Sequence, residues 1–278
     1  MFKFRIISFP LLLALFGYMI FGGLIGALIF NILAPIMIGI AVYELLAMLN
    51  IAGVKSFPTI GGLAALLVTT SITFSSYMVM VGMCFLLAII AAIIAFFLGM
   101  VFIKEEKRLE YIGRGVVTIG ATLLVLMIFI PLIGVFERSS YAMLFLVLTT
   151  KMMDTGGYIF GMLSNKIMPN GNHKIFPTIS PKKSYEGTIG GIIFSVAAGL
   201  ILYHLGYSPF NLTLTVISSI TFAIGSFAGD LTESAIKRCC GVKDSGNIIP
   251  GMGGVFDVLD SFIYNGIIFS FILIALGC

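Results

Sequence analysis

Charged and polar side chains recur at helical spacing within or beside three apolar segments, where they could bind a cation or a phosphorylated substrate. The three sets are Lys151, Asp154, Thr155 and Tyr158; Ser226, Gly229, Asp230 and Glu233; and Asp257, Asp260, Ser261 and Tyr264. Residues three or four apart lie on one face of a helix, so each set predicts a polar stripe. A carboxylate within a bilayer is costly and usually has a partner, so we expect these stripes to be functional.

A purely structural interpretation pairs each buried acid with a neighbouring cation. Lys151 and Asp154 could neutralise each other in this way. The explanation is weaker for Asp230 and Asp257, because the loop between them carries few cations for its acids. The alternative is a divalent cation such as Mg²⁺, which prefers oxygen ligands and could be held by two of these carboxylates.

A glycine-rich turn opens the last apolar segment. It consists of Pro250, Gly251, Gly253 and Gly254. Such a turn exposes backbone N–H groups beside the positive end of a helix dipole, which suits a phosphate group. Any turn before a helix uses the same residue types, so the signal gains weight only from the cations upstream. These cations are Lys237, Arg238 and Lys243.

A second basic stretch covers residues 176–191. Lys182 and Lys183 follow Pro181 and could contact a lipid phosphate or a nucleotide phosphate. The simpler alternative is that these lysines only anchor the loop on the cytoplasmic side of a membrane. Ser184 is predicted to cap the helix that follows, and the pair Gly190 and Gly191 predicts close helix packing.

Composition identifies an all-α polytopic integral membrane protein, because 59% of the residues are hydrophobic and 10% are charged. A transmembrane helix needs about 20 apolar residues. Segments compatible with a span are 8–30, 32–50, 58–74, 77–103, 115–135, 141–162, 187–206, 212–230 and 256–277. We therefore expect nine spans, the first retained rather than cleaved as a signal peptide. Asn31 and Pro35 are predicted to mark the turn between the first two.

The distribution of cations predicts the orientation. With nine spans, 14 of the 16 Lys and Arg residues fall on the side of the N-terminus, Arg138 falls on the opposite side and Lys151 lies within a span. This asymmetry predicts a cytoplasmic N-terminus and a C-terminus outside, with the basic loops on the cytoplasmic side. The expected location is a bacterial inner membrane with the candidate site facing the cytoplasm. We expect an N-terminal helical region, 1–140, and a catalytic region, 141–278, with cytoplasmic loops at 163–186 and 231–255. The second loop is expected to begin as a helix.

Several residues with chemical potential are not assigned a role in the site. His173 and His204 have no acidic neighbour at useful spacing in the sequence and are interpreted as structural. Glu44 stands alone in an apolar segment and is expected to pair with another helix. The four cysteines show no metal-binding spacing and are expected to be free thiols.

Three motifs in order resemble the phosphatidate cytidylyltransferase (CDP-diacylglycerol synthase) family. They are Asp154-Thr-Gly-Gly-Tyr158; Ile179-Ser-Pro-Lys-Lys-Ser-Tyr-Glu-Gly187; and Ser234-Ala-Ile-Lys-Arg238 followed by Lys243-Asp244 and the run from Pro250 to Asp260. The resemblance implies transfer of a cytidylyl group from CTP to phosphatidic acid, which gives CDP-diacylglycerol and pyrophosphate. This sequence departs from the family pattern at two positions. It has Met252 where the family usually has His, and Val258 where the family usually has Arg.

The resemblance and the spacing together predict the site. The predicted catalytic residues are Asp230, Asp257, Lys243 and Asp244. The predicted substrate-binding residues are Asp154, Lys182, Lys183, Ser184, Glu186, Lys237, Arg238, Gly251, Gly253 and Gly254. The predicted Mg²⁺ ligands are Asp230, Asp257 and Asp260. CTP, phosphatidic acid and membrane lipid are the expected partners, without nucleic acid, and a homodimer and a monovalent cation are left open.

Two other functions fit part of the pattern. A CTP-dependent polyprenol or phytol kinase would share the acidic and basic loops, but the match from Lys243 to Asp260 argues against it. An ion-coupled transporter would use intramembrane acids near the bilayer midplane. Asp230 and Asp257 instead fall at one boundary of their segments, and the sequence has no visible repeat.

Overall fold

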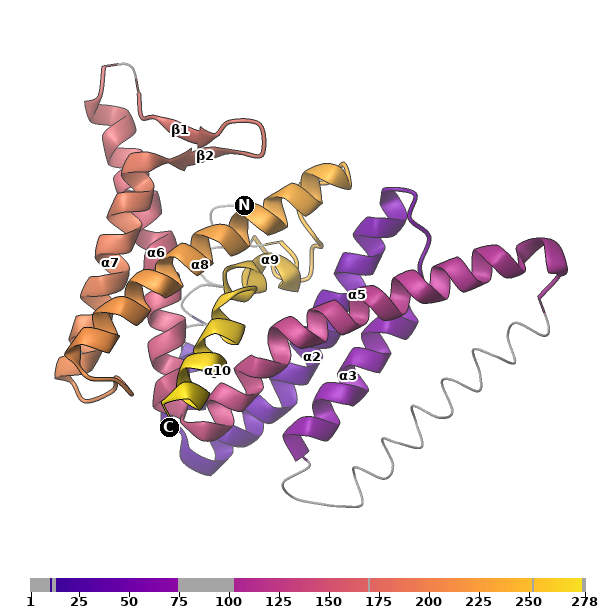
Figure 1. Ribbon diagram of the computed structural model, residues 1–278, viewed down its shortest axis with the longest axis horizontal. Coiled ribbons are helices and arrows are strands. Elements are labelled where there is room, and N and C mark those ends of the chain that lie inside the picture. Colours follow the sequence, from indigo (N-terminus) through magenta and orange to yellow (C-terminus); the bar gives the residue numbers. More distant parts are fainter. Residues whose placement is uncertain (1–10, 12–13, 75–102, 170, 252, 277–278) are drawn as a thin grey trace. The chain divides into compact units, whose positions relative to one another are not determined.

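The structure, a computed structural model, describes residues 11, 14–74, 103–169, 171–251 and 253–276 (Figure 1). The predicted span 77–103 therefore lies almost wholly outside the described residues. The chain divides into two compact units. The first comprises Met1–Ile133 with Cys239–Val258, and the second comprises Gly134–Arg238 with Leu259–Cys278.

The first unit contains α2 (Gly23–Ile51), α3 (Pro58–Phe74), most of α5 (Glu105–Arg138) and the loop that leads into α9 (Val255–Leu259). Helices α2 and α3 cross closely because glycines meet at the crossing. A Cβ atom on Gly62 would lie 2.9 Å from the carbonyl oxygen of Gly39. Such close approach of helix backbones is typical of membrane helices, which gain stability from tight packing.

The predicted turn at Asn31 and Pro35 is wrong, because α2 runs through both residues. The chain bends earlier, at Gly22 and Gly23, after the helical residues 14–21. Gly23 has φ +59°, a left-handed conformation that glycine adopts without the steric cost of a side chain. Pro35 lacks an N–H donor but is tolerated within a membrane helix, where neighbouring groups compensate the lost hydrogen bond.

The second unit contains the remaining helices and a small hairpin. These elements are α6 (Ser140–Ile167), β1 (Lys174–Phe176), β2 (Ser180–Ser184), α7 (Tyr185–His204), most of α8 (Leu212–Cys239), the 3₁₀ turn η1 (Asp260–Phe262) and α10 (Asn265–Ala275). Strands β1 and β2 are antiparallel and connect α6 to α7, which lie side by side (Figure 1). The buried rings of Phe145, Phe222 and Phe269 pack against one another in its core.

Glycines allow α6 and α7 to pack at short range, as predicted for Gly190 and Gly191. A Cβ atom on Gly191 would lie 2.6 Å from the carbonyl oxygen of Met153, and one on Gly190 would overlap the ring of Phe160. Ser184 caps α7 as predicted, because its hydroxyl accepts a hydrogen bond from the Gly187 N–H at 3.2 Å. The hairpin is therefore attached directly to a helix start.

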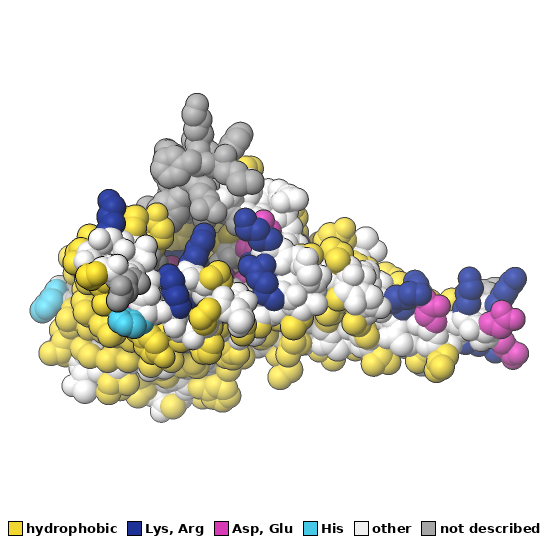
Figure 2. Space-filling model, turned by 90° about the horizontal axis from the view of Figure 1, so that it is seen from above, with side chains coloured by type: hydrophobic (Ala, Val, Ile, Leu, Met, Phe, Trp, Pro, Cys, Tyr) yellow, Lys and Arg dark blue, Asp and Glu magenta, His cyan; other side chains and the backbone are white. Residues whose placement is uncertain are grey.

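The described helices fit a polytopic membrane protein. Among the described residues, five helical segments are long and apolar enough to cross a membrane: α2, α5, α7, α8 and the stretch Val255–Ala275. The shorter α3 is also apolar. Hydrophobic side chains cover much of the visible surface in Figure 2, and many large apolar residues are exposed on these helices. Exposed apolar surface of this extent is expected where lipid replaces water as the solvent.

Candidate active site

The second unit contains a pocket of about 210 Å³ between α6, β2, α7 and α8. Its lining comprises Met153, Asp154, Gly157, Tyr158, Lys182, Lys183, Ser184, Gly187, Thr188, Phe227 and Asp230. Predicted residues from three distant stretches of the sequence therefore meet here: Asp154 from α6, both lysines from β2 and Asp230 from α8. The pocket combines two cations and two carboxylates with apolar walls, a combination suited to a phosphorylated amphiphile.

Lys183 has three contacts that orient it within the pocket. Its Nζ lies 3.3 Å from Asp230 Oδ2, donates to the carbonyl oxygen of Phe227 at 3.0 Å, and lies 4.4 Å from the centre of the Phe227 ring. The Lys183 side chain is only 18% exposed, whereas Lys182 is an exposed residue at the pocket rim. An ammonium fixed in this way can neutralise an anionic group without a large loss of side-chain freedom.

Lys151 and Asp154 form the local pair that the spacing allowed, with Nζ 3.3 Å from Oδ2. The pair belongs to a larger network. Lys151 also donates to the Ser261 hydroxyl, and the Ser226 hydroxyl donates to Asp154 Oδ1 at 3.0 Å. Asp230 and Asp260 interact electrostatically with the same ammonium. Neutralisation is therefore shared among three carboxylates that come from α6, α8 and η1.

The predicted stripe from Asp257 to Tyr264 on one helical face is wrong, because the helix is interrupted. Helix α9 ends at Leu259, η1 covers Asp260–Phe262 and α10 starts at Asn265. The buried Asn265 amide donates to Thr150 Oγ1 and to the Phe222 carbonyl oxygen, both at 2.9 Å, and so ties the start of α10 to α6 and α8. The interruption brings Asp260 close to Asp230 within the second unit.

Gly229 makes room for this arrangement. A Cβ atom on Gly229 would lie 2.2 Å from the carbonyl oxygen of Asp260, a separation that no side chain could tolerate. The side chains of Asp230 and Asp260 lie within hydrogen-bonding reach of each other. Two carboxylates this close repel each other unless a proton or a cation lies between them.

These two carboxylates fit a Mg²⁺ site of the open kind. Across the described parts of the chain, no group of three His, Cys, Asp or Glu side chains converges as an all-protein metal cage would require. Mg²⁺ is commonly held by one or two carboxylates together with water and substrate phosphates. Asp230 and Asp260 match that pattern, with Asp154 near both.

Asp257 belongs to the first unit and is engaged by its own loop. Its Oδ2 accepts from the Gly254 N–H at 2.8 Å, and its carboxylate accepts from the Ser245 N–H at 3.0 Å. Asp257 is the third residue of α9, so the first contact closes the helix start in the manner of a capping box. Gly251 and Gly253 have φ +80° and +104°, and an isolated bridge joins Ile249 to Gly253. These glycines shape a tight turn.

Other predicted substrate-binding residues are distributed differently. Lys237 forms an ion pair of 2.5 Å with Glu233, which is buried. Arg238, Lys243 and Asp244 are exposed at or after the end of α8, which continues to Cys239 as the helical start predicted for this loop. Met252 lies outside the described residues. The predicted roles of these residues stay predictions.

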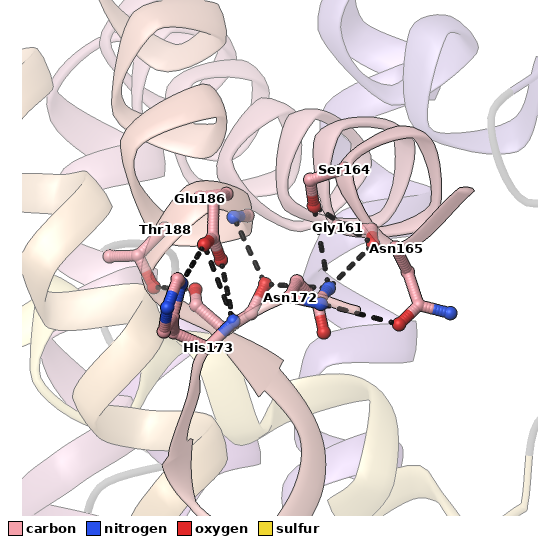
Figure 3. A network of polar contacts seen from close by, with 9 residues as sticks. Gly161, Ser164, Asn165, Asn172, His173, Glu186 and Thr188 are labelled. Carbon is pink, nitrogen blue, oxygen red and sulfur yellow. Dashed lines mark hydrogen bonds and ion pairs between the residues drawn. The ribbon is translucent and has the colours of Figure 1, made fainter. Parts of the chain in front are cut away.

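Glu186 has a partner that sequence spacing did not reveal. His173 was expected to lack an acidic neighbour, but its Nδ1 lies 2.7 Å from Glu186 Oε1, and its backbone N–H donates to the same carboxylate (Figure 3). Asn172 donates through its amide to Gly161 O at 2.7 Å and to Ser184 Oγ at 3.1 Å. The strand pairing of the hairpin brings these residues together, a relationship that linear spacing cannot show.

Comparisons with known proteins agree with the motifs. The sequence model of the cytidylyltransferase family matches residues 3–276. Proteins named phosphatidate cytidylyltransferase from Staphylococcus saprophyticus and Staphylococcus haemolyticus are 44% and 43% identical to the chain over 123 residues. One from Staphylococcus aureus is 41% identical over 126 residues. Each match covers 44% of the relative and 44–45% of this chain, so the chain aligns with less than half the length of these relatives.

Proposed function

We propose that this chain, which belongs to the cytidylyltransferase family, transfers the cytidylyl group of CTP to phosphatidic acid. The products are CDP-diacylglycerol and pyrophosphate. The aligned relatives carry the name of this activity. The observation that carries the proposal is the pocket in which Lys183 and Asp230 meet beside Asp154.

The reaction has simple demands. A phosphate oxygen of phosphatidic acid attacks the α-phosphorus of CTP, a new P–O bond forms, and the bond from the α-phosphorus to the bridging oxygen breaks to release pyrophosphate. Such transfers depend on positioning and on neutralising negative charge more than on covalent catalysis. The pocket offers both, because the Lys183 ammonium is held in place and the walls include the apolar side chains of Met153 and Phe227.

Individual residues would divide these tasks. Lys183 and Lys182 would bind a substrate phosphate in the pocket, and Lys151 would keep Asp154 oriented. Lys237 and Arg238 in the last turn of α8, and Lys243 and Asp244 after it, would act on the polyphosphate. The N–H groups of Gly251, Gly253 and Gly254 would take part as well. Ser184 and Glu186 would hold the hairpin on α7 and so place the two lysines.

Within the second unit, Asp230 and Asp260 would hold Mg²⁺, and the role of Asp257 as a ligand stays a prediction from the sequence. Bound Mg²⁺ would neutralise charge on the phosphate oxygens and polarise them. The proximity of two carboxylates beside Lys151 supports this assignment. A monovalent cation beside Mg²⁺ stays open, because the single Lys151 ammonium is shared among three carboxylates.

The finer topology is part of the proposal. Nine spans with a cytoplasmic N-terminus would place the motifs on the cytoplasmic side of a bacterial inner membrane, where CTP is available. The supporting observation is that most cations fall on one side of such a layout. A homodimer is compatible with this arrangement and is common among membrane enzymes.

Purified protein in detergent micelles, supplied with labelled CTP, phosphatidic acid and Mg²⁺, tests the proposal. We expect label in lipid and release of pyrophosphate, both lost in Asp230→Ala. Glu106→Ala, which removes an exposed carboxylate from α5 with no role in the proposed site, is the control and should keep its activity. Folded wild-type protein that transfers no label would contradict the proposal.

A further inference from the structure

We infer that Glu44 is a positioning residue that holds the loop Ser245–Gly254 against the start of α9, and that cytidylyl transfer depends on it. The inference rests on the proposed function, because that function gives the loop its role in the reaction. Glu44 lies in α2, far from the motifs in sequence, and all the residues involved belong to the first unit.

Glu44 is buried, at 2% exposure, yet its contacts are with hydrogen-bond donors of the loop and of the helix that follows. Its Oε1 accepts from the Val255 N–H at 3.1 Å. Its Oε2 accepts from the Phe256 N–H at 2.8 Å and from the Ser245 hydroxyl at 3.0 Å. A buried carboxylate is costly unless it is hydrogen-bonded, and hydrogen bonds to a charged acceptor are among the strong ones.

The same serine joins Glu44 to Asp257. The Ser245 hydroxyl donates to Glu44, and the Ser245 N–H donates to Asp257. Asp257 also accepts from Gly254 at the other end of the loop. Glu44 and Asp257 both bind Ser245, the first residue of the loop, and Asp257 also binds Gly254, the last. The two carboxylates therefore hold the two ends of the loop together.

Two glycines show that the loop is fitted around this carboxylate. Cβ atoms on Gly246 and Gly254 would each lie 2.4 Å from an oxygen of Glu44. Gly254 is part of the motif that the sequence predicted to bind phosphate. The close approach of the Glu44 carboxylate explains why residue 254 has no side chain. The sequence pattern alone does not reveal this reason.

The consequence for function is geometric. Glu44 fixes the first two residues of α9, and Asp257 is the third. A displacement of about 1 Å in a catalytic group can lower a rate about 10²-fold. Glu44 would thus affect the rate through Asp257 and the turn, without touching a substrate.

The test uses the full chain in detergent micelles with four variants: Glu44→Gln, Ser245→Ala, the double variant and Thr73→Val. Glutamine has the same size, but its amide NH₂ must face a backbone N–H donor. Thr73 is a matched control, because it is a buried polar residue of α3 that hydrogen-bonds to Asn31 O and Thr70 O rather than to the loop. The readouts are kcat, the KM for CTP and the rate of trypsin cleavage after the exposed Lys243.

We expect Glu44→Gln to lower kcat about 10²-fold, with a smaller change in KM, and to accelerate cleavage after Lys243, because proteolysis requires local opening of the chain. Ser245→Ala should lower kcat less, and its effect should shrink in the Glu44→Gln background, as expected for residues that act through one contact. Thr73→Val should leave kcat and cleavage unchanged.

Wild-type kcat and wild-type resistance to trypsin in Glu44→Gln would overturn the inference. Fully additive effects of Glu44→Gln and Ser245→Ala in the double variant would overturn it as well. If Glu44→Gln does not fold, Ser245→Ala alone decides: unchanged kcat and unchanged cleavage overturn the inference. If the wild-type protein transfers no label, the proposed function fails, and accelerated cleavage in Glu44→Gln would still support the loop-holding contact.

Discussion

Lys183 of the hairpin and Asp230 of the polar stripe on α8 form an ion pair of 3.3 Å in the wall of one pocket. Lys183 is the fourth residue of β2, and Asp230 lies in α8. Each would be expensive to hold away from bulk water without the other. In the proposed function, a substrate phosphate would bind Lys183 and Mg²⁺ would bind Asp230, so each partner of this pair would have a ligand of its own.

Lys183→Met should lower kcat about 10²- to 10³-fold, as expected when a preorganised group that stabilises developing charge is removed. The substitution keeps most of the apolar stem and removes the ammonium. Lys174→Met is the control on the same hairpin, because Lys174 is exposed and does not line the pocket. Steady-state rates of label transfer measure both variants, and equal losses would show that hairpin charge alone matters.

Asp260→Asn should raise the Mg²⁺ concentration needed for half-maximal activity by about 10- to 100-fold, as found when support of a metal site is weakened. Removing Mg²⁺ with a chelator should abolish transfer, and restoring it should recover the rate. Titration of activity with Mg²⁺ gives the measurement. An unchanged Mg²⁺ dependence in Asp260→Asn would remove Asp260 from the metal site.

Gly229→Ala should destabilise the second unit and lower activity, because its Cβ would collide with the Asp260 carbonyl oxygen. Overpacking of this kind typically costs about 1–3 kcal/mol. Gly120→Ala is the matched helical control, since a Cβ atom there meets no atom within 4 Å. Thermal unfolding in detergent compares the two. A Gly229→Ala variant as stable and active as Gly120→Ala would show that Asp260 is not held against α8.

Cys239 should react with a maleimide faster than Cys240 at neutral pH. Cys239 is exposed, whereas Cys240 is 5% exposed, and burial raises the pKa of the Cys240 thiol. A higher pKa means less thiolate at a given pH, so the raised pKa of Cys240 adds to the effect of its burial and slows its alkylation at neutral pH. Mass spectrometry of a Cys84→Ser, Cys278→Ser background measures both rates, and faster labelling of Cys240 would contradict the burial of its thiol.

Sequence periodicity predicted the helices well where apolar runs end in clear polar loops. The cap at Ser184 and the continuation of α8 to Cys239 follow from local rules of capping and charge, whereas α6 runs to Ile167, beyond the predicted end at residue 162. The bend at Gly23 was missed, because Pro35 was the stronger breaker by local propensity. Packing with neighbouring helices overrides that propensity inside a membrane protein.

The site was predictable as a set of residue types but not as a geometry. The sequence assigned Asp154, Lys183 and Asp230 to one site, and all three line the same pocket; their roles in the reaction stay predictions. Asp260, which interacts with Asp230, lies in a 3₁₀ turn between α9 and α10, and a regular helical stripe does not predict this interruption. Glu44 carried no signal except its isolation in an apolar segment. A lone carboxylate at such a position is a reason to look for backbone donors as partners.

The most direct test of the central claim is to follow the two ends of CTP separately in one purified preparation. With phosphatidic acid and Mg²⁺, label in the α-phosphate should enter lipid, and label in the γ-phosphate should appear in pyrophosphate. Both should disappear in Asp230→Ala. Transfer of the γ label to a lipid alcohol, with CDP as the other product, would contradict cytidylyl transfer and identify a kinase.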